Sequence, residues 1–273
     1  MSLASNIEWT DSTWNPITGC TKVSPGCKHC YAEALAERFR GVPGHPYEQG
    51  FDLKIWPDRL ELPVRWKEPK MIFVNSMSDL FHEDIPDEYI ARVFDVMMRA
   101  DQHVFQLLTK RSNRMMEWTR RRYRFVNEKG GGKTLLPKHI WLGVSVENQN
   151  FTERIAHLQN VPARVRFLSV EPLLGPVELQ TSMLRGIHWV IVGGESGHRA
   201  RPMDPAWAIS LQQACAENGV PFFFKQWGAH DLHGRRVGKR VAGRILQGRT
   251  WDEMPAMAGA CLRRIVTRDR KDT

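Results

Sequence analysis

The sequence predicts an α/β fold, namely a complete or partial TIM-like barrel of six or seven βα units, followed by a basic C-terminal extension over residues 231–273. Two observations predict this fold. After residue 70, short apolar runs rich in β-branched and aromatic residues alternate with amphipathic stretches, which is the pattern of a parallel sheet covered by helices. Polar residues follow each apolar run, as they do in barrels whose site lies at the carboxyl ends of the strands. Residues 1–230 are therefore expected to form one barrel domain.

The apolar runs are expected to be strands, with one further short strand before Cys20. Each run has the length and the β-branched or aromatic content of a buried strand, and polar or turn-forming residues bound it. The predicted strands are Met71–Asn75, His103–Thr109, His139–Ser145, Val165–Val170, Ile187–Gly193 and Pro221–Lys225.

Helices are expected between most of these strands and directly after the N-terminal cysteines. Pro86 and Asp87 are typical of a helix start, and Gly219 is typical of a helix end. The predicted helices are Tyr31–Phe39, Asp87–Ala100, Ser112–Arg122, Asn148–Leu158 and Pro205–Asn218. Three consecutive glycines at residues 130–132 predict a flexible loop before Pro137.

Composition places the chain among ordinary globular proteins, with 42% hydrophobic and 25% charged residues. No apolar run approaches the roughly 20 residues of a membrane helix, and the N-terminus lacks the pattern of a signal peptide. The expected location is the cytoplasm. Thiols stay reduced there, so the five cysteines are better interpreted as ligands or packing residues than as disulfides.

The net charge of +9 favours a polyanionic partner such as nucleic acid. Two stretches carry most of it. Residues 110–124 hold seven Lys or Arg against one Glu, and residues 231–273 hold eleven against five acidic residues. The first is either a solvated helix face or a phosphate contact, and the second either a mobile tail or a phosphate contact. Trp118 and Tyr123, among the arginines, either stack on bases or pack against the core.

The strongest local signal is a C-x6-C-x2-C arrangement of Cys20, Cys27 and Cys30, in a loop that precedes a helix. Three thiols on one loop can share one metal centre. Structural zinc usually has four protein ligands, whereas a [4Fe–4S] cluster with one iron left for another molecule has three. The fourth ligand therefore distinguishes the two kinds of site.

Two histidines and two cysteines are candidates for that fourth position. His29 lies inside the loop and would have to fold back on it, and His82 follows the second predicted strand at the presumed mouth. Cys215 has the spacing of a core residue in the last long helix, and Cys261 lies in the basic tail. Both cysteines are expected to pack rather than to bind metal.

The cysteine loop, the helix after it and the α/β pattern resemble the radical S-adenosylmethionine (SAM) superfamily. More closely, six motifs in order resemble a family of phage and bacterial proteins of unknown function that is described as radical-SAM-like. The resemblance covers about residues 6–229. The motifs are WNPITGC, SPGCKHCYAE, NSMSDLFH, SVEPLLGP, GGESG and FFFKQWG.

The resemblance implies that Cys20, Cys27 and Cys30 bind three irons of a [4Fe–4S] cluster, and that the fourth iron binds SAM. Reduction by an electron donor would then yield a 5′-deoxyadenosyl radical. The sequence departs from the superfamily in two respects. Six residues separate the first two cysteines where three are usual, and the GGE motif expected after the second strand occurs late, at Gly193, Gly194 and Glu195.

Polar residues after the predicted strands are the candidates for binding SAM. Asn75, Ser76 and Asp79 could bind its ammonium group, or could cap a helix and form a turn. Gly193 and Gly194 could admit the adenine or ribose, with Glu195 on a hydroxyl group, or could form a simple turn. The methionine end or the substrate could meet Ser145, Glu147 and Glu171, the last of which Pro172 follows in a fixed turn.

The candidates for a substrate or nucleic-acid contact are Lys110, Arg111, Arg114, Lys225, Gln226 and Trp227. No sequence motif identifies a catalytic side chain, and those of P-loop nucleotide hydrolases, serine hydrolases of the G-x-S-x-G type and HExxH zinc proteases do not occur. Two hypotheses follow: a radical SAM enzyme that modifies or repairs nucleic acid, or a non-catalytic nucleic-acid-binding protein that contains zinc or a cluster.

Overall fold

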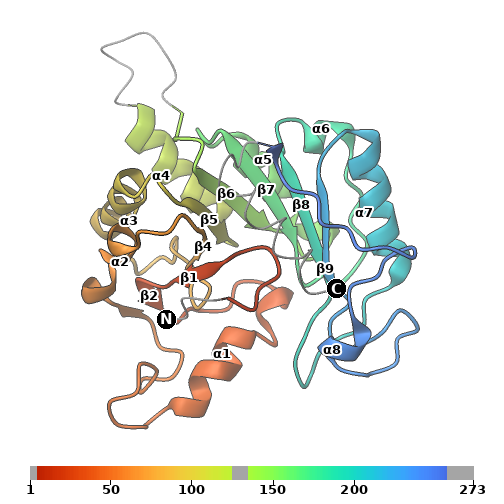
Figure 1. Ribbon diagram of the computed structural model, residues 1–273, viewed down its shortest axis with the longest axis horizontal. Helices are drawn as coiled ribbons and strands as arrows, with labels where there is room; N and C mark the ends of the chain where they lie inside the picture. The colour runs from red at the N-terminus through yellow and green to blue at the C-terminus, as the bar shows by residue number, and fades with distance from the viewer. Residues whose placement is uncertain (1–4, 125–134, 257–273) are drawn as a thin grey trace.

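The computed structural model describes residues 5–124 and 135–256, and in them seven parallel strands form one curled sheet (Figure 1). The strand order is β1-β4-β5-β6-β7-β8-β9, so each strand of this sheet pairs with the sheet's next strand along the chain, and β1 and β9 are the two edges. This half-barrel is consistent with a partial TIM-like barrel. The strands are β1 (Ser12–Trp14), β4 (Met71–Val74), β5 (Val104–Thr109), β6 (Ile140–Ser145), β7 (Val165–Val170), β8 (Trp189–Gly193) and β9 (Phe222–Gln226).

The main helices follow the strands as predicted, with two differences. The predicted helix 31–39 divides into α1 (Tyr31–Ala36) and the 3-10 helix η2 (Glu37–Phe39), and 148–158 into η5 (Gln149–Phe151) and α5 (Glu153–Gln159). The Asn148 side chain accepts a hydrogen bond from the Asn150 backbone N–H, which fixes a separate short turn before α5. The remaining elements are β2 (Ile17–Thr18), η1 (Pro25–Cys27), β3 (Lys54–Ile55), η3 (Pro57–Arg59), α2 (Leu62–Arg65), α3 (Asp87–Arg99), α4 (Ser112–Arg124), α6 (Thr181–Leu184), α7 (Pro205–Glu217) and α8 (Lys239–Ala242).

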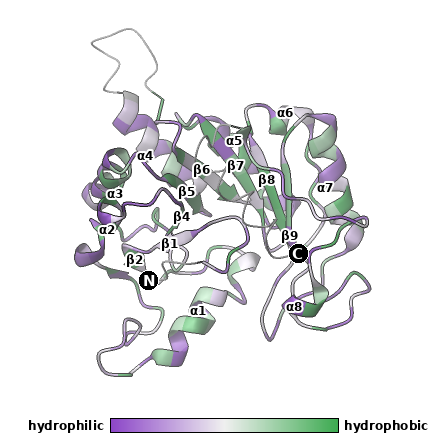
Figure 2. Ribbon diagram, viewed as in Figure 1, coloured by the Kyte–Doolittle hydropathy of each residue, from purple (hydrophilic) through white to green (hydrophobic). Residues whose placement is uncertain are grey.

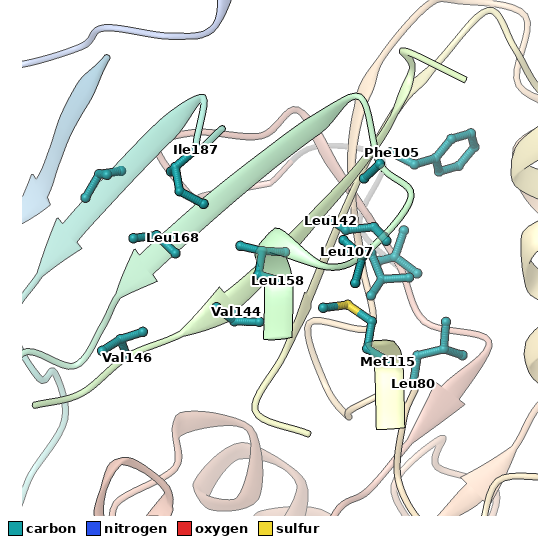
Figure 3. Close-up of a cluster of buried hydrophobic side chains, with 14 of the residues drawn as sticks. Leu80, Phe105, Leu107, Met115, Leu142, Val144, Val146, Leu158, Leu168 and Ile187 are labelled. Carbon is teal, nitrogen blue, oxygen red and sulfur yellow. The ribbon is translucent and has the colours of Figure 1, made fainter. Parts of the chain in front are cut away.

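One face of the sheet packs against the helices. Alternate strand residues such as Leu107, Leu142 and Val144 contribute to this core, together with Met115 of α4 and Leu158 of α5 (Figure 3). The strands are correspondingly the most uniformly hydrophobic part of the ribbon in Figure 2. Strands buried on both faces explain why the apolar runs were nearly continuous in the sequence.

The other, concave face of the sheet holds a second and largely aromatic cluster. Its members include Phe73, Phe167, Trp189 and Phe223, and the N-terminal residue Trp9 packs onto them with its ring centroid 4.7 Å from that of Phe73. Aromatic rings therefore fill the interior of the half-barrel and form a floor below the carboxyl ends of the strands.

Residues 231–256 belong to the predicted basic C-terminal extension, and its segment 251–253 lies against the sheet. Phe224 donates its backbone N–H to Trp251, and Glu253 donates to Phe222, so this segment runs along the free edge of β9. Trp189 Nε1 also donates to the Glu253 carbonyl at 2.7 Å. The sequence did not predict this contact, because the backbone groups of an edge strand can bond to a segment of any sequence.

Two other predictions concern parts of the chain outside the described residues. The glycine loop at residues 130–132 is one, and Cys261 with the remaining basic residues after 256 is the other. Within residues 5–124 and 135–256, no helix is both long enough and apolar enough to span a membrane.

Candidate functional site

The three clustered cysteines lie at the carboxyl end of the sheet, where β2, η1 and the start of α1 present them. All three thiols are free and partly exposed. Cys20, Cys27 and Cys30 line one hollow of about 150 Å³, together with residues that follow β4 and β5. The fold thus brings the predicted ligand trio to the predicted mouth.

Gly19 allows the chain to place Cys20 there. Its φ of +83° is in the left-handed region, and a Cβ at this position would lie 2.2 Å from the Asp52 carbonyl oxygen. The Cys20 N–H donates to the Phe51 carbonyl at 3.3 Å. The start of the cysteine loop is therefore held against the 51–52 segment at a distance that only glycine permits.

Arg111, which follows β5, holds the same end of the loop. Its Nη1 lies 3.3 Å from Cys20 Sγ, and its Nη2 donates to Thr21 Oγ1 at 2.7 Å. On its other side Nε donates to Glu83 at 2.8 Å, and Nη1 lies 3.4 Å from Asp79. The guanidinium group is only 9% exposed, so these partners fix its orientation.

Glu147, which follows β6, holds the middle of the loop. Its carboxylate is fully buried, accepts a hydrogen bond from Ser24 Oγ and pairs with Arg154 at 2.9 Å and with Lys110 at 3.7 Å. Because protein groups already bond to it, this carboxylate stabilises the loop and is not available to bind a ligand.

Arg201 and Glu195 hold the loop from the side of β8. Arg201 donates to the Pro25 carbonyl at 2.9 Å and pairs with Glu195 at 2.6 Å. Burial by itself would raise the pKa of Glu195, but the hydrogen bonds and charge of Arg201 lower it below its usual value. Glu195 was predicted to meet a ribose hydroxyl, whereas here both of its oxygens accept from Arg201.

Burial also affects the cysteine thiols. It raises the pKa of Cys20 to about 11, with the Asp79 carboxylate acting in the same direction and Arg111 opposing it. Burial raises the pKa of Cys30 as well. Metal-free protein therefore holds these two groups as neutral thiols at pH 7, and a metal that binds them displaces protons.

A larger cavity of about 350 Å³ continues from Cys27 and Cys30 across the carboxyl ends of β7, β8 and β9. Phe73 and Leu108 form part of its apolar lining, and Ser145 and Ser169 are polar groups in it. Glu171 and Lys225 form an ion pair of 3.1 Å in its wall. The cavity therefore combines an apolar floor with a few polar groups, as small-molecule sites do.

Several buried polar atoms beside these two spaces lack a hydrogen-bond partner. They are Trp9 Nε1 and Gln226 Oε1 in residues that line the larger cavity, and both amide atoms of Asn75 in the smaller one. Asn75 also has a φ of 59°, which is rare for a residue with a side chain. Unpaired buried polar atoms are uncommon in native proteins, so these four atoms of three residues are free to bond to a ligand or to water at the mouth.

Other predicted SAM contacts have partners within the protein. Asp79 accepts from Thr109 Oγ1, Lys110 N and Phe81 N, and therefore acts as a cap. Ser76 Oγ forms a hydrogen bond with Asn15. Close packing accounts for the two glycines: a Cβ would lie 2.6 Å from Glu171 Oε1 at Gly193, and 2.0 Å from the Trp227 carbonyl at Gly194.

Most of the described arginines of the 110–124 run are paired with carboxylates. Arg121 pairs with Asp87, and Arg122 with Asp95. Arg114 donates to the His82 and Ile85 carbonyls and to Asp87. Neutralisation by α3 thus accounts for much of this charge without a phosphate.

Two tryptophans that were candidates for contact with nucleic acid, Trp118 and Trp227, are packed inside the protein. Trp227 is 4% exposed and donates to the Ile245 carbonyl, and Trp118 is also 4% exposed and packs on Phe94. Cys215 is fully buried in the core, which confirms its predicted packing role.

Single-ion binding has little support in the part of the chain that the structure describes. No group of three or more His, Cys, Asp or Glu side chains in it, the three clustered cysteines included, is arranged to hold a metal ion. His82 has both ring nitrogens in hydrogen bonds, with Thr21 Oγ1 and with the Asp84 N–H. A tetrahedral zinc ion needs sulfurs roughly 4 Å apart, because each Zn–S bond is about 2.3 Å. A four-iron cluster needs a wider trio, because each thiolate binds a different iron.

Sequence reasoning did not identify three residues that shape this site. Trp9 and Lys239 come from the two ends of the described chain and line the cavity, and Arg201 anchors the loop. A basic residue shortly after the GGESG motif was a usable signal for Arg201, since the loop after a strand that ends at the mouth can reach the site. No motif or pattern in the neighbouring sequence identified Trp9 or Lys239 as residues of the site.

A family model described as "Protein of unknown function (DUF5131)" matches residues 4–255. The chain belongs to this family. The match includes the segment that covers the edge of β9, so the DUF5131 fold extends beyond the residue 229 at which the resemblance in the sequence was expected to end. A search of curated proteins found no match to this DUF5131 chain.

Among solved structures, spore photoproduct lyase complexed with dinucleoside spore photoproduct matches with a TM-score of 0.39 and 11% sequence identity. The alignment covers 74% of the DUF5131 chain and 59% of the lyase chain, so the chain spans less than two thirds of the lyase's length.

Proposed function

We propose that this DUF5131 chain is a radical SAM enzyme with a [4Fe–4S] cluster on Cys20, Cys27 and Cys30. The observation that carries the proposal is that three free thiols line one hollow, which adjoins a larger cavity with unpaired polar groups. Three thiol ligands leave one iron for an outside molecule.

The proposed cluster and SAM would together supply, on reduction by an electron donor, a radical that abstracts hydrogen from the substrate. The protein's own residues would position the reactants and exclude water. Asn75, whose amide is unpaired beside the cysteines, is the residue we propose for a polar group of SAM. The cavity walled by Glu171 and Lys225 would receive the remainder of SAM or the substrate.

Nucleic acid is the substrate class that we propose, on the basis of the net charge of +9. Arg111, Arg114, Arg121 and Arg122 all have acidic partners, so phosphate contacts would fall to exposed cations instead. Lys28 between the cysteines and Arg120 on α4 are two such residues. Binding to an oligonucleotide should then weaken steeply with salt, and salt-independent or absent binding would contradict this substrate class.

Anaerobic reconstitution with iron and sulfide tests the proposed reaction class. The protein should become brown, contain about four irons per chain, and release 5′-deoxyadenosine when reduced in the presence of SAM. Each of C20S, C27S and C30S should lose the cluster, whereas C215S should retain it because Cys215 is buried in the core away from the site. A colourless protein that takes up one zinc ion would instead support the non-catalytic alternative.

A further inference from the structure

Arg111 lies between two carboxylates and the thiol of Cys20, at the edge of the cysteine loop. On one side it faces Asp79 and Glu83, and on the other Nη1 points to Cys20 Sγ at 3.3 Å. Among the described residues, no guanidinium group contacts Cys27 or Cys30. The three thiols are therefore not electrostatically equivalent in the part of the chain that the structure describes.

The guanidinium group has little freedom to leave this position. Its exposed fraction is 9%, its backbone N–H donates to Thr109 Oγ1 at 2.9 Å, and Nη2 donates to Thr21 Oγ1, the residue after Cys20. Thr21 Oγ1 in turn contacts His82 Nε2 at 2.8 Å. Because several partners hold the guanidinium group, it should keep its direction toward the sulfur when Cys20 binds the proposed cluster.

We infer that Arg111 is a positioning residue that holds Cys20 and makes the cluster easier to reduce. This inference rests on the proposed function. Reduction adds one negative charge to a cluster, and some of that charge lies on its cysteine sulfurs. A hydrogen bond and a nearby positive charge stabilise the reduced state more than the oxidised state, which raises the reduction potential.

The sequence had suggested another role for this residue, since Arg111 belongs to a basic run that could contact phosphate. The contact with Cys20 and the pairing with two carboxylates favour the role toward the sulfur. Arg114 lies one turn further along the chain, on α4, and pairs with Asp87 and with backbone carbonyls rather than with a cysteine. It is a matched control, because its replacement removes the same charge nearby.

The test is a redox titration of reconstituted full-length protein, followed by visible absorbance and by the EPR signal of the reduced cluster. R111M should bind iron and be harder to reduce, with a tenfold smaller equilibrium constant for reduction, which is a potential about 59 mV more negative for one electron. R111K keeps the charge but not the shape of the donor, and should fall between R111M and the original protein. R114M should titrate as the original does.

Equal potentials in R111M, R114M and the original protein would overturn the inference while leaving the proposed function intact. If R111M binds too little iron to titrate, R111K decides: a lowered potential supports the inference and an unchanged one overturns it. Failure of the original protein to bind a cluster would overturn the proposed function itself, and the inference with it. These results are distinguishable by iron content before any potential is measured.

Discussion

Glu147 is fully buried, and three other residues reach its carboxylate. The energetics of such a group are asymmetric. A buried ion pair adds little stability compared with apolar residues of the same volume. Removing one partner, however, leaves the other charge unpaired in the low-dielectric interior of the protein, which is strongly destabilising. The Glu147 carboxylate also accepts a hydrogen bond from the Ser24 hydroxyl, so the Glu147–Arg154 ion pair is linked directly to the cysteine loop.

We expect E147Q to lower the free energy of unfolding by about 3–5 kcal/mol, because Arg154 stays 5% exposed and loses its carboxylate. Urea unfolding followed by circular dichroism measures this. R121Q breaks an ion pair whose partners are 64% and 42% exposed, and should cost less than about 1 kcal/mol. Similar losses in the two variants would mean that Glu147 is not the buried anchor described here.

Glu37 is a second residue with a testable charge. Hydrogen bonds from Arg40, together with the Phe51 backbone N–H, lower the pKa of Glu37 from 4.5 to about 2. Because the folded-state pKa is depressed, the interaction stabilises the protein above about pH 4.5 and is lost as the pH falls through about 2. Carboxyl titration by NMR should give a midpoint near 2 in the original protein and nearer 4.5 in R40Q. An unchanged midpoint in R40Q would contradict the assigned cause.

At the scale of elements, the start of the cysteine loop depends on a close backbone approach at Gly19. The six predicted strands and the helices α3, α4 and α7 have bounds within two residues of those expected, and regular elements tolerate shifts of that size. The loop does not, because it has few backbone hydrogen bonds of its own and is positioned by Phe51, Arg111, Glu147 and Arg201.

G19A should therefore harm both folding and iron uptake. A Cβ would lie 2.2 Å from the Asp52 carbonyl oxygen, so β2 or the 51–52 segment has to move, and Cys20 moves with it. G44A is the control, because Gly44 has a similar φ of +73° but no atom within 4 Å of the added Cβ. The control should lose only about 1–2 kcal/mol from backbone strain and keep its iron. Equal iron content in both variants would show that Gly19 does not position Cys20.

At the scale of the whole molecule, an open half-barrel has two edges to protect. The segment 251–253 covers β9, and Trp251 packs edge-on against Phe222 with ring centroids 5.7 Å apart. Through this covering, part of the otherwise basic 231–256 region belongs to the folded unit. An exposed β9 would present unpaired backbone groups and aromatic side chains to other chains.

We expect W251A to lower the free energy of unfolding by about 2–4 kcal/mol and to promote aggregation on warming, because the cover over β9 loosens. Thermal unfolding with light scattering measures both effects. L232A, in the same part of the chain, alters a side chain that is 47% exposed and should change stability by less than about 0.5 kcal/mol. A W251A protein that unfolds and aggregates like L232A would argue against the covering role.

The sequence by itself determined the α/β class, the six strands after residue 70 and the polar residues that end those strands. These follow from local patterns: hydrophobic runs identify buried parallel strands, and the residues after such strands must meet at one edge of the sheet. It also identified Asn75, Glu171 and Lys225 as residues of that edge, since each stands at the end of a strand.

Only the tertiary structure decided which of the polar residues are available. Asp79 and Glu195 have all their carboxylate oxygens occupied by protein donors, Trp227 is buried, and Arg111 faces a sulfur rather than solvent. The physical reason is that a charged or polar side chain at a mouth can be satisfied by any neighbour that the fold brings within about 3 Å. Many of those neighbours are distant in sequence, as Thr109 is from Asp79, Arg111 from Cys20 and Arg201 from Pro25.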